Sequence, residues 1–452
     1  MSTPWNRRCA QRMQWMHGSA IRELLKLTEQ PDIISFGGGM PAPELFPVDA
    51  FRAAADRVLK KQGRKALQYS ATEGYRPLRE WIVRQMARYG IESAPENVFI
   101  TSGSQQALDM LGMLLINPGD LILTERPTYL GALQAWRAYQ AEFISVPVDD
   151  DGLRVDLLEE ALCAGPKFMY ILPNFQNPGG VTLSLERRHK LIEFSDRYGV
   201  PIIEDDPYGE LRYEGEHLPP LVVIDAERCR RHSDQTAGTT DYYAQNKPNN
   251  ANDRAYMRGN VIYLSTFSKT LAPGLRLAWM VAPVEVIQRC NVAKQGMDLH
   301  TATLNQMIAH EILTGGEEGD DFLMGHVRLI REVYRERRDA MLAAMERHFP
   351  DGVMWTEPSG GLFLWVTLPD YLDATELLRD ALKQKVAYVP GSSFSPEGSD
   401  QNTLRLNFSL CDPPTIERGI RRLGEVFTKA IEAHAAEAGF FRKDSAPELV
   451  AI

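Results

Sequence analysis

Short runs of apolar residues alternate with segments of helical period through the middle of the chain. The runs predict strands at Val98–Thr101, Leu121–Thr124, Phe168–Leu172, Pro201–Glu204, Val261–Ser265 and Leu275–Val281. Between them, helical periods cover Gln105–Ile116, Leu130–Tyr139 and Leu185–Tyr198. Because strand–helix–strand alternation requires crossover connections, this pattern predicts an α/β fold with a mainly parallel sheet sandwiched by helices.

The pattern changes after this region, where helical periods become longer and apolar runs fewer. The predicted elements are helices over Val284–Leu313 and Asp320–His348, a strand at Leu362–Thr367, a helix over Ala374–Lys383, a strand at Thr403–Phe408 and a helix over Pro414–Ala438. We therefore expect a smaller α+β domain. The predicted division is an N-terminal arm and helix (1–45), a large domain (46–315), a small C-terminal domain (316–440) and a tail (441–452).

Two segments do not fit the regular pattern. Cys229–Tyr256 contains no Val, Ile, Leu, Phe, Met or Trp, so the insertion 229–256 is expected to form a long, mobile surface loop. The arginine-rich start of the chain resembles a transit peptide, but an ordinary helix over Arg12–Leu27 is the simpler interpretation.

Composition narrows the classes of partner. The 452-residue chain has a formal net charge of −10, which disfavours a nucleic-acid partner because phosphate backbones require a basic face. Its five cysteines form no CxxC pair, as expected of free thiols in a reducing compartment, and we expect a cytoplasmic protein. No stretch approaches the ~20 apolar residues of a membrane span.

A lysine flanked by hydroxyl residues follows one predicted strand. In Ser265-Thr266-Phe267-Ser268-Lys269, the lysine lies at the carboxyl end of the strand, where open α/β sheets bind ligands. A lysine amine forms an imine with an aldehyde cofactor, although most lysines are solvated surface charges. Thr266, Ser268 and nearby Arg276 are suited to holding a phosphate.

Three consecutive acids end another predicted strand. Asp205 should emerge at the carboxyl end, and a buried carboxylate needs a cationic partner. A protonated pyridine nitrogen is such a partner, and the resulting cationic ring is a strong electron sink. The acids are also compatible with a helix cap or a metal site. Since no histidine lies nearby, we discount a metal and interpret Glu204 and Asp206 as structural.

Two turn segments also follow predicted strands. Asn177, within Asn174–Gly180, is able to donate a hydrogen bond to a phenolate oxygen. The Gly/Ser turn in Thr101–Gln106 opens a helix, and its free backbone N–H groups suit a phosphate. Each segment alone is compatible with an ordinary turn. Together with Lys269 and Asp205, they supply contacts for the phosphate, ring oxygen, ring nitrogen and aldehyde of one cofactor.

This set resembles the fold-type-I, class I/II pyridoxal-phosphate aminotransferases, and within them the branch of 2-aminoadipate and kynurenine aminotransferases. The resemblance extends from Ile21-Arg22-Glu23 through Ile34–Pro41 to Leu404–Phe408. It implies an aspartate-aminotransferase-like fold, a pyridoxal 5′-phosphate cofactor and a homodimer with active sites at the interface. Two departures are Gly179 in place of the usual threonine of N-P-T-G, and Thr266 where serine is common.

The resemblance also implies a role for each matching residue. Lys269 is the Schiff-base lysine, Asp205 pairs with the pyridinium nitrogen, and Tyr208 completes the catalytic set by bonding the ring oxygen together with Asn177. Tyr129 stacks on the ring. The phosphate contacts are Ser104, Gln105, Thr266, Ser268 and Arg276. The substrate contacts are Arg405 at the α-carboxylate, Asn177, Tyr69 from the partner subunit, and Gly39 and Arg22 at the side-chain pocket.

The expected reaction is ping-pong transfer of an amino group from an L-amino acid to a 2-oxo acid, with 2-oxoglutarate as the expected acceptor. Arg22 suits a second carboxylate, as in 2-aminoadipate or glutamate, or is a surface charge; aromatic and branched or aliphatic donors also remain open. One alternative is a pyridoxal-phosphate-dependent lyase or decarboxylase. Another is an aminotransferase-like regulatory protein, which the acidic charge and the roughly thirty residues before Ser35–Pro41 disfavour.

Overall fold

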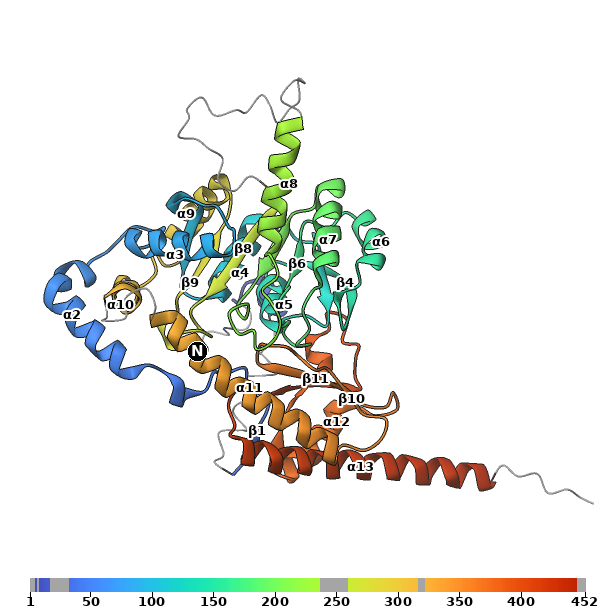
Figure 1. Cartoon of the computed structure of the whole chain (residues 1–452). Coiled ribbons are helices and arrows are strands. Elements are labelled where there is room, and N and C mark those ends of the chain that lie inside the picture. The colour runs from blue at the N-terminus through green and yellow to red at the C-terminus, as the bar shows by residue number, and fades with distance from the viewer. Residues whose placement is uncertain (1–4, 6–7, 17–31, 236–258, 316–321, 445–452) are drawn as a thin grey trace, which may run out of the picture.

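A computed structural model describes residues 5, 8–16, 32–235, 259–315 and 322–444, with backbone alone for 232–235 and 437–444. An eight-stranded sheet forms the centre, in the order β2-β9-β8-β7-β6-β3-β4-β5 (Figure 1). The strands are β2 (Val98–Thr101), β3 (Leu121–Arg126), β4 (Glu142–Asp149), β5 (Gly152–Leu153), β6 (Met169–Ile171), β7 (Ile202–Asp205), β8 (Val261–Thr266) and β9 (Ala278–Val281). The neighbours β8, β7, β6, β3 and β4 are parallel, whereas β9 is antiparallel to β2 and β8.

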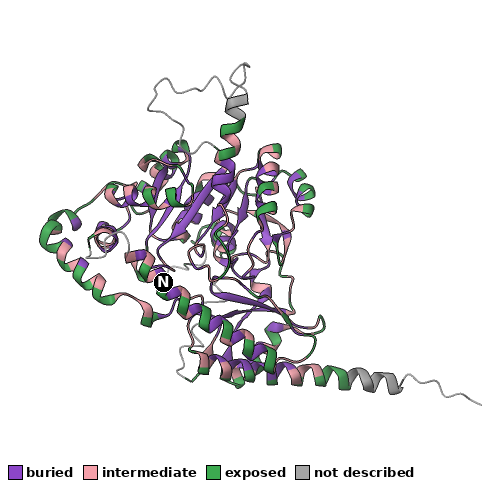
Figure 2. Cartoon of the chain, viewed as in Figure 1, coloured by how far each residue is buried: buried purple, intermediate pink, exposed green. Residues whose placement is uncertain are grey.

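Helices cover both faces of this sheet, and the strands between them are buried (Figure 2). Alternate strand residues face opposite layers: Ile202 joins one apolar cluster, and Ile203 joins the other. The first cluster includes α3 (Arg76–Arg88), α6 (Leu158–Cys163), α7 (Leu185–Tyr198), α8 (Leu221–Gln235) and α10 (Thr303–Thr314). The second includes α4 (Ser104–Leu115), α5 (Leu130–Arg137) and α9 (Val284–Met297). The long helix α2 (Val48–Ala66) packs against α10.

The later part of the chain builds a second, antiparallel sheet in the order β10-β11-β14-β13. Its strands are β10 (Met354–Trp355), β11 (Phe363–Thr367), β13 (Val389–Pro390) and β14 (Thr403–Asn407), with helices α11 (Phe322–His348), α12 (Ala374–Lys383) and α13 (Pro413–Asp444). The early strand β1 (Ile34–Ser35) pairs in parallel with β12 (Val386–Ala387). The segment after β1 is thereby held beside the C-terminal sheet.

The structure corrects several sequence predictions. The helix predicted over Val284–Leu313 is interrupted between α9 and α10, where Leu299 adopts a positive φ of 67°. The polar insertion predicted from Cys229 begins inside α8, which continues to Gln235; its remaining residues, 236–256, lie outside the described chain. The tail predicted from 441 begins inside α13, because this helix reaches Asp444.

The predicted N-terminal helix over Arg12–Leu27 is also wrong where the structure describes it. Gln11–Gln14 forms a short 3-10 helix that ends at Trp15, and none of its residues is buried. Without a buried apolar face, a longer helix lacks the packing that stabilises most helices. Residues 17–31, which include Arg22, lie outside the described chain.

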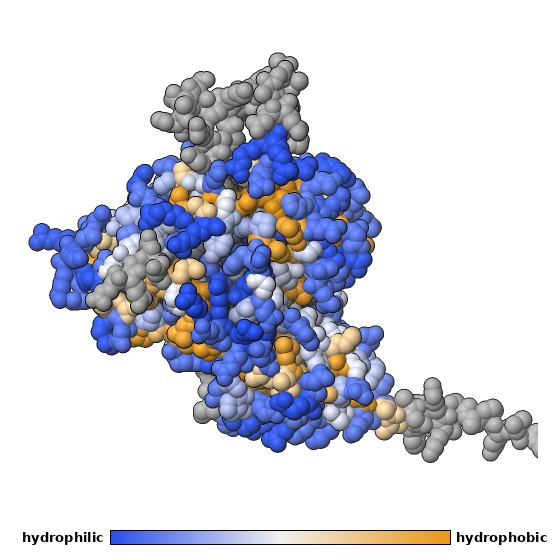
Figure 3. All heavy atoms as spheres, viewed as in Figure 1, coloured by the Kyte–Doolittle hydropathy of each residue, from blue (hydrophilic) through white to orange (hydrophobic). Residues whose placement is uncertain are grey.

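Polar residues cover most of the face in Figure 3, and apolar side chains gather in separate areas. Among the described residues, none of the helices has both the length and the apolar character needed to cross a membrane.

Candidate active site

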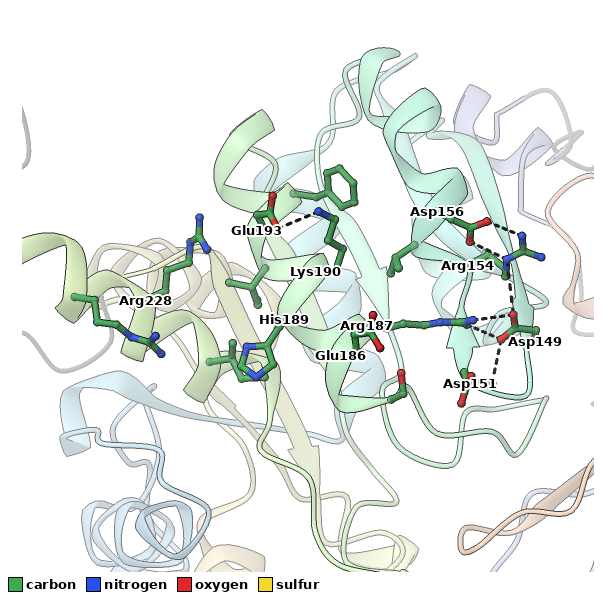
Figure 4. Close-up of a pocket in the computed structure, with 16 residues that line it drawn as sticks. Asp149, Asp151, Arg154, Asp156, Glu186, Arg187, His189, Lys190, Glu193 and Arg228 are labelled. Carbon is green, nitrogen blue, oxygen red and sulfur yellow. Dashed lines mark hydrogen bonds and ion pairs between the residues drawn. The ribbon is translucent and has the colours of Figure 1, made fainter.

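A hollow of about 1020 Å³ lies between α7, α8 and the turn after β4 (Figure 4). Its walls are highly charged, but most of the charged groups satisfy one another. The pairs are Arg187 with Asp149 at 2.9 Å, Arg154 with Asp156 at 2.5 Å, and Lys190 with Glu193 at 3.1 Å. These pairs leave little unbalanced charge for a ligand.

A second cavity of about 280 Å³ opens at the carboxyl ends of β6, β7 and β8, beneath the C-terminal sheet. This edge is where α/β sheets bind ligands. The lining residues are Gly39, Ser104, Gln105, Tyr129, Leu172, Asn177, Asp205, Pro207, Tyr208, Thr266, Ser268, Lys269, Pro273, Arg276, Phe363 and Arg405. The structure therefore brings together all the site residues predicted from the sequence except Arg22 and Tyr69.

Lys269 follows β8 and reaches into this cavity. Its Nζ donates a 2.8 Å hydrogen bond to the carbonyl of Gly39. Burial lowers the pKa of Lys269 to about 8, and the positive charges of Arg405 and Arg276 act in the same direction. About a tenth of this amine is therefore neutral at pH 7, and a neutral amine is the nucleophilic form.

Asp205 is the last residue of β7 and is only 2% exposed. Its Oδ2 accepts a 2.7 Å hydrogen bond from the hydroxyl of Tyr170, whereas Oδ1 is buried without a partner among the described residues. Burial raises the pKa of Asp205 to about 7, although the Tyr170 hydrogen bond opposes this effect. A cationic N–H group opposite Oδ1 would satisfy the atom and stabilise the carboxylate.

The two acids next to Asp205, Glu204 and Asp206, make structural hydrogen bonds. Glu204 accepts hydrogen bonds from the backbone N–H groups of Leu221 and Val222, at 2.8 and 2.9 Å, at the start of α8. Asp206 accepts from Asn174 at 3.1 Å and from Tyr263 at 3.2 Å. These contacts agree with the structural interpretation of both acids made from the sequence.

Hydroxyl groups and a guanidinium line one end of the cavity, where α4 begins. Gly103 precedes the helix with a φ of +91°, and Ser104 Oγ is buried without a partner among the described residues. A Cβ at Gly103 would overlap the guanidinium of Arg276. The hydroxyl of Thr266 donates a 2.9 Å hydrogen bond to the hydroxyl of Ser268. Free helix N–H groups, hydroxyls and an arginine form a typical phosphate site.

Gln105 contributes differently from the other residues at this end. Its side-chain amide donates a 2.7 Å hydrogen bond to the Gly131 carbonyl. Although Gln105 lines the cavity, this contact ties its side chain to α5.

The opposite wall carries Arg405, which projects from β14 and is 2% exposed. Its Nη1 donates to Asn177 Oδ1 at 2.7 Å, and its Nη2 donates to the Gly37 carbonyl at 2.8 Å. Its guanidinium carbon lies 4.2 Å from the centre of the Phe363 ring, and Nε is buried without a partner in the described chain. Burial lowers the pKa of Arg405 to about 10, so the side chain remains cationic at neutral pH.

Asn177 connects this wall to Tyr208, whose hydroxyl lies 3.5 Å from Asn177 Nδ2. Burial raises the pKa of Tyr208 far above its usual value. Tyr129 borders the same cavity at the start of α5. These three residues provide an aromatic face and hydrogen-bonding groups between the hydroxyl-lined end of the cavity and Arg405.

Tyr69 does not line the cavity of the single chain. It is 78% exposed, and its ring makes an edge contact with His300 at 5.7 Å. Two participants were missed from the sequence. Phe363 lines the cavity and supports Arg405, while Tyr170 bonds Asp205 from below. The available signal for Tyr170 was a hydroxyl inside a fully apolar strand, since a buried tyrosine usually needs a partner.

Comparison with known proteins identifies the family. The family model for aminotransferase class I and II matches residues 31–423. The chain belongs to the class I and II aminotransferases. It is 44% identical over 92% of its length to an aromatic-amino-acid aminotransferase from Thermococcus litoralis, of which 93% is covered. A 2-aminoadipate transaminase from Thermus thermophilus is 42% identical over 90% of this chain and 94% of its own.

A solved structure supports the same assignment. The α-aminoadipate aminotransferase of Thermus thermophilus, complexed with N-(5′-phosphopyridoxyl)-L-leucine, matches with a TM-score of 0.82 and 39% identity over 95% of this chain and all of that one. This aminotransferase is thus a pyridoxal-phosphate-dependent transaminase with an aspartate-aminotransferase-like fold. The comparisons do not favour the lyase alternative.

Gly103 provides a test of the hydroxyl-lined end of the cavity. We expect Gly103→Ala to weaken pyridoxal phosphate binding by about tenfold or more, because an alanine there is strained and displaces Arg276. Equilibrium dialysis of the cofactor measures the change. Gly119→Ala is the matched control, since Gly119 has a φ of +85° and open space around its Cβ position. Equal weakening in both variants would contradict a specific role for the Gly103 turn.

Proposed function

We propose that the cavity beneath β14 holds pyridoxal 5′-phosphate and the amino-acid substrate together. The observation that carries this proposal is the set of buried, unpartnered atoms among its described residues: Ser104 Oγ, Asp205 Oδ1 and Arg405 Nε. In that order, these atoms suit a phosphate, a protonated ring nitrogen and a substrate carboxylate. Unpaired buried polar atoms are costly, so a ligand that satisfies all three gains affinity from each.

The remaining lining residues complete the cofactor site. Thr266, Ser268 and Arg276 join Ser104 and Gln105 at the phosphate, and Asn177 and Tyr208 bond the ring oxygen. Tyr129 covers the ring. When bound, pyridoxal phosphate supplies an electron sink for the pair of electrons left at the substrate Cα.

Lys269 has two roles in this proposal. Its amine would hold the cofactor covalently until the amino group of the donor replaces it. The released amine would then act as the base that takes the proton from the donor Cα and as the acid that returns it. The lowered pKa of about 8 suits this task, because a general base works best when its pKa is near the working pH.

Arg405 is proposed to bind the α-carboxylate common to all donors. The proposed donors are 2-aminoadipate and aromatic or aliphatic amino acids, with 2-oxoglutarate as acceptor. Support comes from the names of the relatives, one an aromatic-amino-acid and one a 2-aminoadipate enzyme. Gly39 borders this end of the cavity. We also propose that Arg22 lies near the side chain of the donor, and this placement rests on the sequence resemblance alone.

A panel of amino donors tests this assignment. Each donor is mixed with purified holoenzyme in the absence of acceptor, and the absorbance of the bound cofactor is followed as its aldehyde becomes an amine. We expect conversion by 2-aminoadipate, aromatic or aliphatic donors, with one 2-oxo acid formed per site. Release of ammonia or carbon dioxide instead would contradict transamination, and no conversion with any of these three donor classes would contradict the donor assignment.

Arg405→Lys tests the carboxylate contact. Lysine cannot reproduce the fork that reaches both Asn177 and Gly37, so we expect kcat/KM for the donor to fall about 10- to 100-fold. Arg337→Lys is the control, because Arg337 is a buried arginine that bonds Glu44 and the Ser409 carbonyl outside the cavity. An unchanged kcat/KM in Arg405→Lys would remove Arg405 from the substrate site.

We further propose a cytoplasmic homodimer in which Tyr69 enters the partner's cavity. The exposure of Tyr69 in the single chain and the role that the family resemblance implies for it support this arrangement. Light scattering should give the mass of two 50.9 kDa chains, and a monomeric active enzyme would contradict the proposal.

A further inference from the structure

Tyr170 lies beneath Asp205 on the neighbouring strand β6. Its side chain is fully buried, and its hydroxyl donates a 2.7 Å hydrogen bond to Asp205 Oδ2. The other oxygen, Oδ1, has no partner among the described residues, and Asp205 lines the cavity. The two oxygens of Asp205 therefore differ: Oδ2 is hydrogen-bonded to the protein, and Oδ1 is available to a ligand.

The position of the phenol is fixed by the helices that cover this face of the sheet. The Tyr170 ring makes an edge contact with Trp136 of α5, with ring centres 5.1 Å apart. The Trp136 indole in turn donates a 2.9 Å hydrogen bond to the Leu108 carbonyl in α4. Since α4 also begins at Ser104, one packed unit supports both the phosphate end and the Asp205 end of the cavity.

The hydroxyl is held in its donating form. Burial and the negative charge of Asp205 raise the pKa of Tyr170 well above its usual value, and Tyr129, just before α5, and Glu125 of β3 add to this effect. Asp206 is the other acid that acts on Asp205, and it raises the pKa of that carboxyl. A phenol that stays protonated is able only to donate to a carboxylate, which stabilises the ionised form.

We propose that Tyr170 is a positioning residue that keeps Asp205 ionised with Oδ1 free, so that a cofactor ring nitrogen opposite Oδ1 retains its proton. This inference rests on the proposed function, because it requires the ring nitrogen at Asp205. Without the phenol, Oδ1 becomes more basic and takes the proton from the ring nitrogen. The proton moves from nitrogen to oxygen with no other reactant, and the ring loses its positive charge.

Tyr170→Phe tests this role in the holoenzyme. A neutral ring withdraws fewer electrons from the nitrogen that joins Lys269 to the cofactor, so that nitrogen becomes more basic. We expect the pH midpoint of the visible absorbance of the bound cofactor to rise by about one unit, because the loss of a hydrogen bond to a charged group changes a pKa by about that amount. We also expect kcat to fall about tenfold, with the donor KM nearly unchanged.

Tyr388→Phe is the matched control. Tyr388 is also fully buried, and its hydroxyl donates a 2.7 Å hydrogen bond to the Ala374 carbonyl, away from the cavity. Loss of this hydrogen bond should lower thermal stability about as much as Tyr170→Phe does, but it should leave the absorbance midpoint unchanged. A second comparison introduces Tyr170→Phe into an Asp205→Asn background, where the further loss of kcat should disappear because no carboxylate remains to be tuned.

The outcomes separate this inference from the proposed function. An unshifted midpoint in a folded Tyr170→Phe holoenzyme would overturn the role of Tyr170, as would equal shifts in Tyr170→Phe and Tyr388→Phe. A full additional loss of kcat in the double variant would also overturn it. Failure of the unmodified protein to retain pyridoxal phosphate would instead contradict the proposed function.

Discussion

Lys269→Ala should lose transaminase activity by about 10⁴-fold or more, because one residue supplies both the covalent anchor and the proton transfer. The buried amine beside Gly39 has no substitute at this position, because Arg276 and Arg405, the other lining cations in the described part of the chain, carry guanidinium groups that do not form an imine. Initial rates with the best amino donor measure the loss. Borohydride reduction followed by mass spectrometry should add the cofactor to the unmodified protein and leave the variant unlabelled.

Lys269→Arg separates the positive charge of Lys269 from its nucleophilicity. The guanidinium keeps the charge and most of the length but does not form an imine, so both variants should lose labelling and turnover. Both should still bind pyridoxal phosphate reversibly through the phosphate end of the cavity. Normal activity in either variant would disprove the assignment of Lys269.

Asp205→Asn should lower kcat about 100- to 1000-fold, as removal of a preorganised charge from an active site commonly does. Asparagine keeps the volume, but it lacks the negative charge that stabilises a protonated ring nitrogen. The pH-dependent absorbance of the bound cofactor should change together with kcat, which separates an effect on the ring from a general loss of folding.

Asp225→Asn is the matched control for this substitution. Asp225 is a buried acid whose pKa burial raises to about 6, and it accepts hydrogen bonds from the backbone of Asn260 and Val261 at 2.7 and 3.1 Å. These contacts lie at the start of β8, whereas Lys269 follows its end. Asp225→Asn should reduce stability and leave kcat within about twofold per folded enzyme. Equal losses of kcat in both variants would contradict a specific role for Asp205.

Much of the sheet could be predicted because its strands are buried on both faces and therefore appear as unbroken apolar runs, as in β7 and β8. Strand β4 was missed, since it is only partly buried and contains Ser145 and Pro147. The direction of β9 was not predictable from its run, because apolar residues do not encode direction. Only the pairing of Leu264 with Met280 and its neighbours shows that β9 is antiparallel.

The candidate site was predictable to the extent that its groups follow strand ends in short motifs. Asp205 directly follows an apolar run, and Lys269 and Asn177 stand four and five residues after the ends of theirs. Arg405 required the family resemblance, since it lies inside a strand between Leu404 and Leu406. Tyr170 was missed because its role depends on Asp205, which lies 35 positions away in the sequence. Only the register of β6 against β7 brings the two side chains into contact.

The backbone after β1 has a consequence for how the protein is made. Its carbonyls at Gly37 and Gly39 accept hydrogen bonds from Arg405 and Lys269, so residues 368 and 230 positions apart meet at one early segment. During synthesis, all eight strands of the central sheet have emerged once Val281 has left the ribosome, but β14 follows more than a hundred residues later. A nascent chain that stalls before Thr403 would thus carry Lys269 and the Gly103 turn but lack Arg405, leaving one wall of its cavity unfinished.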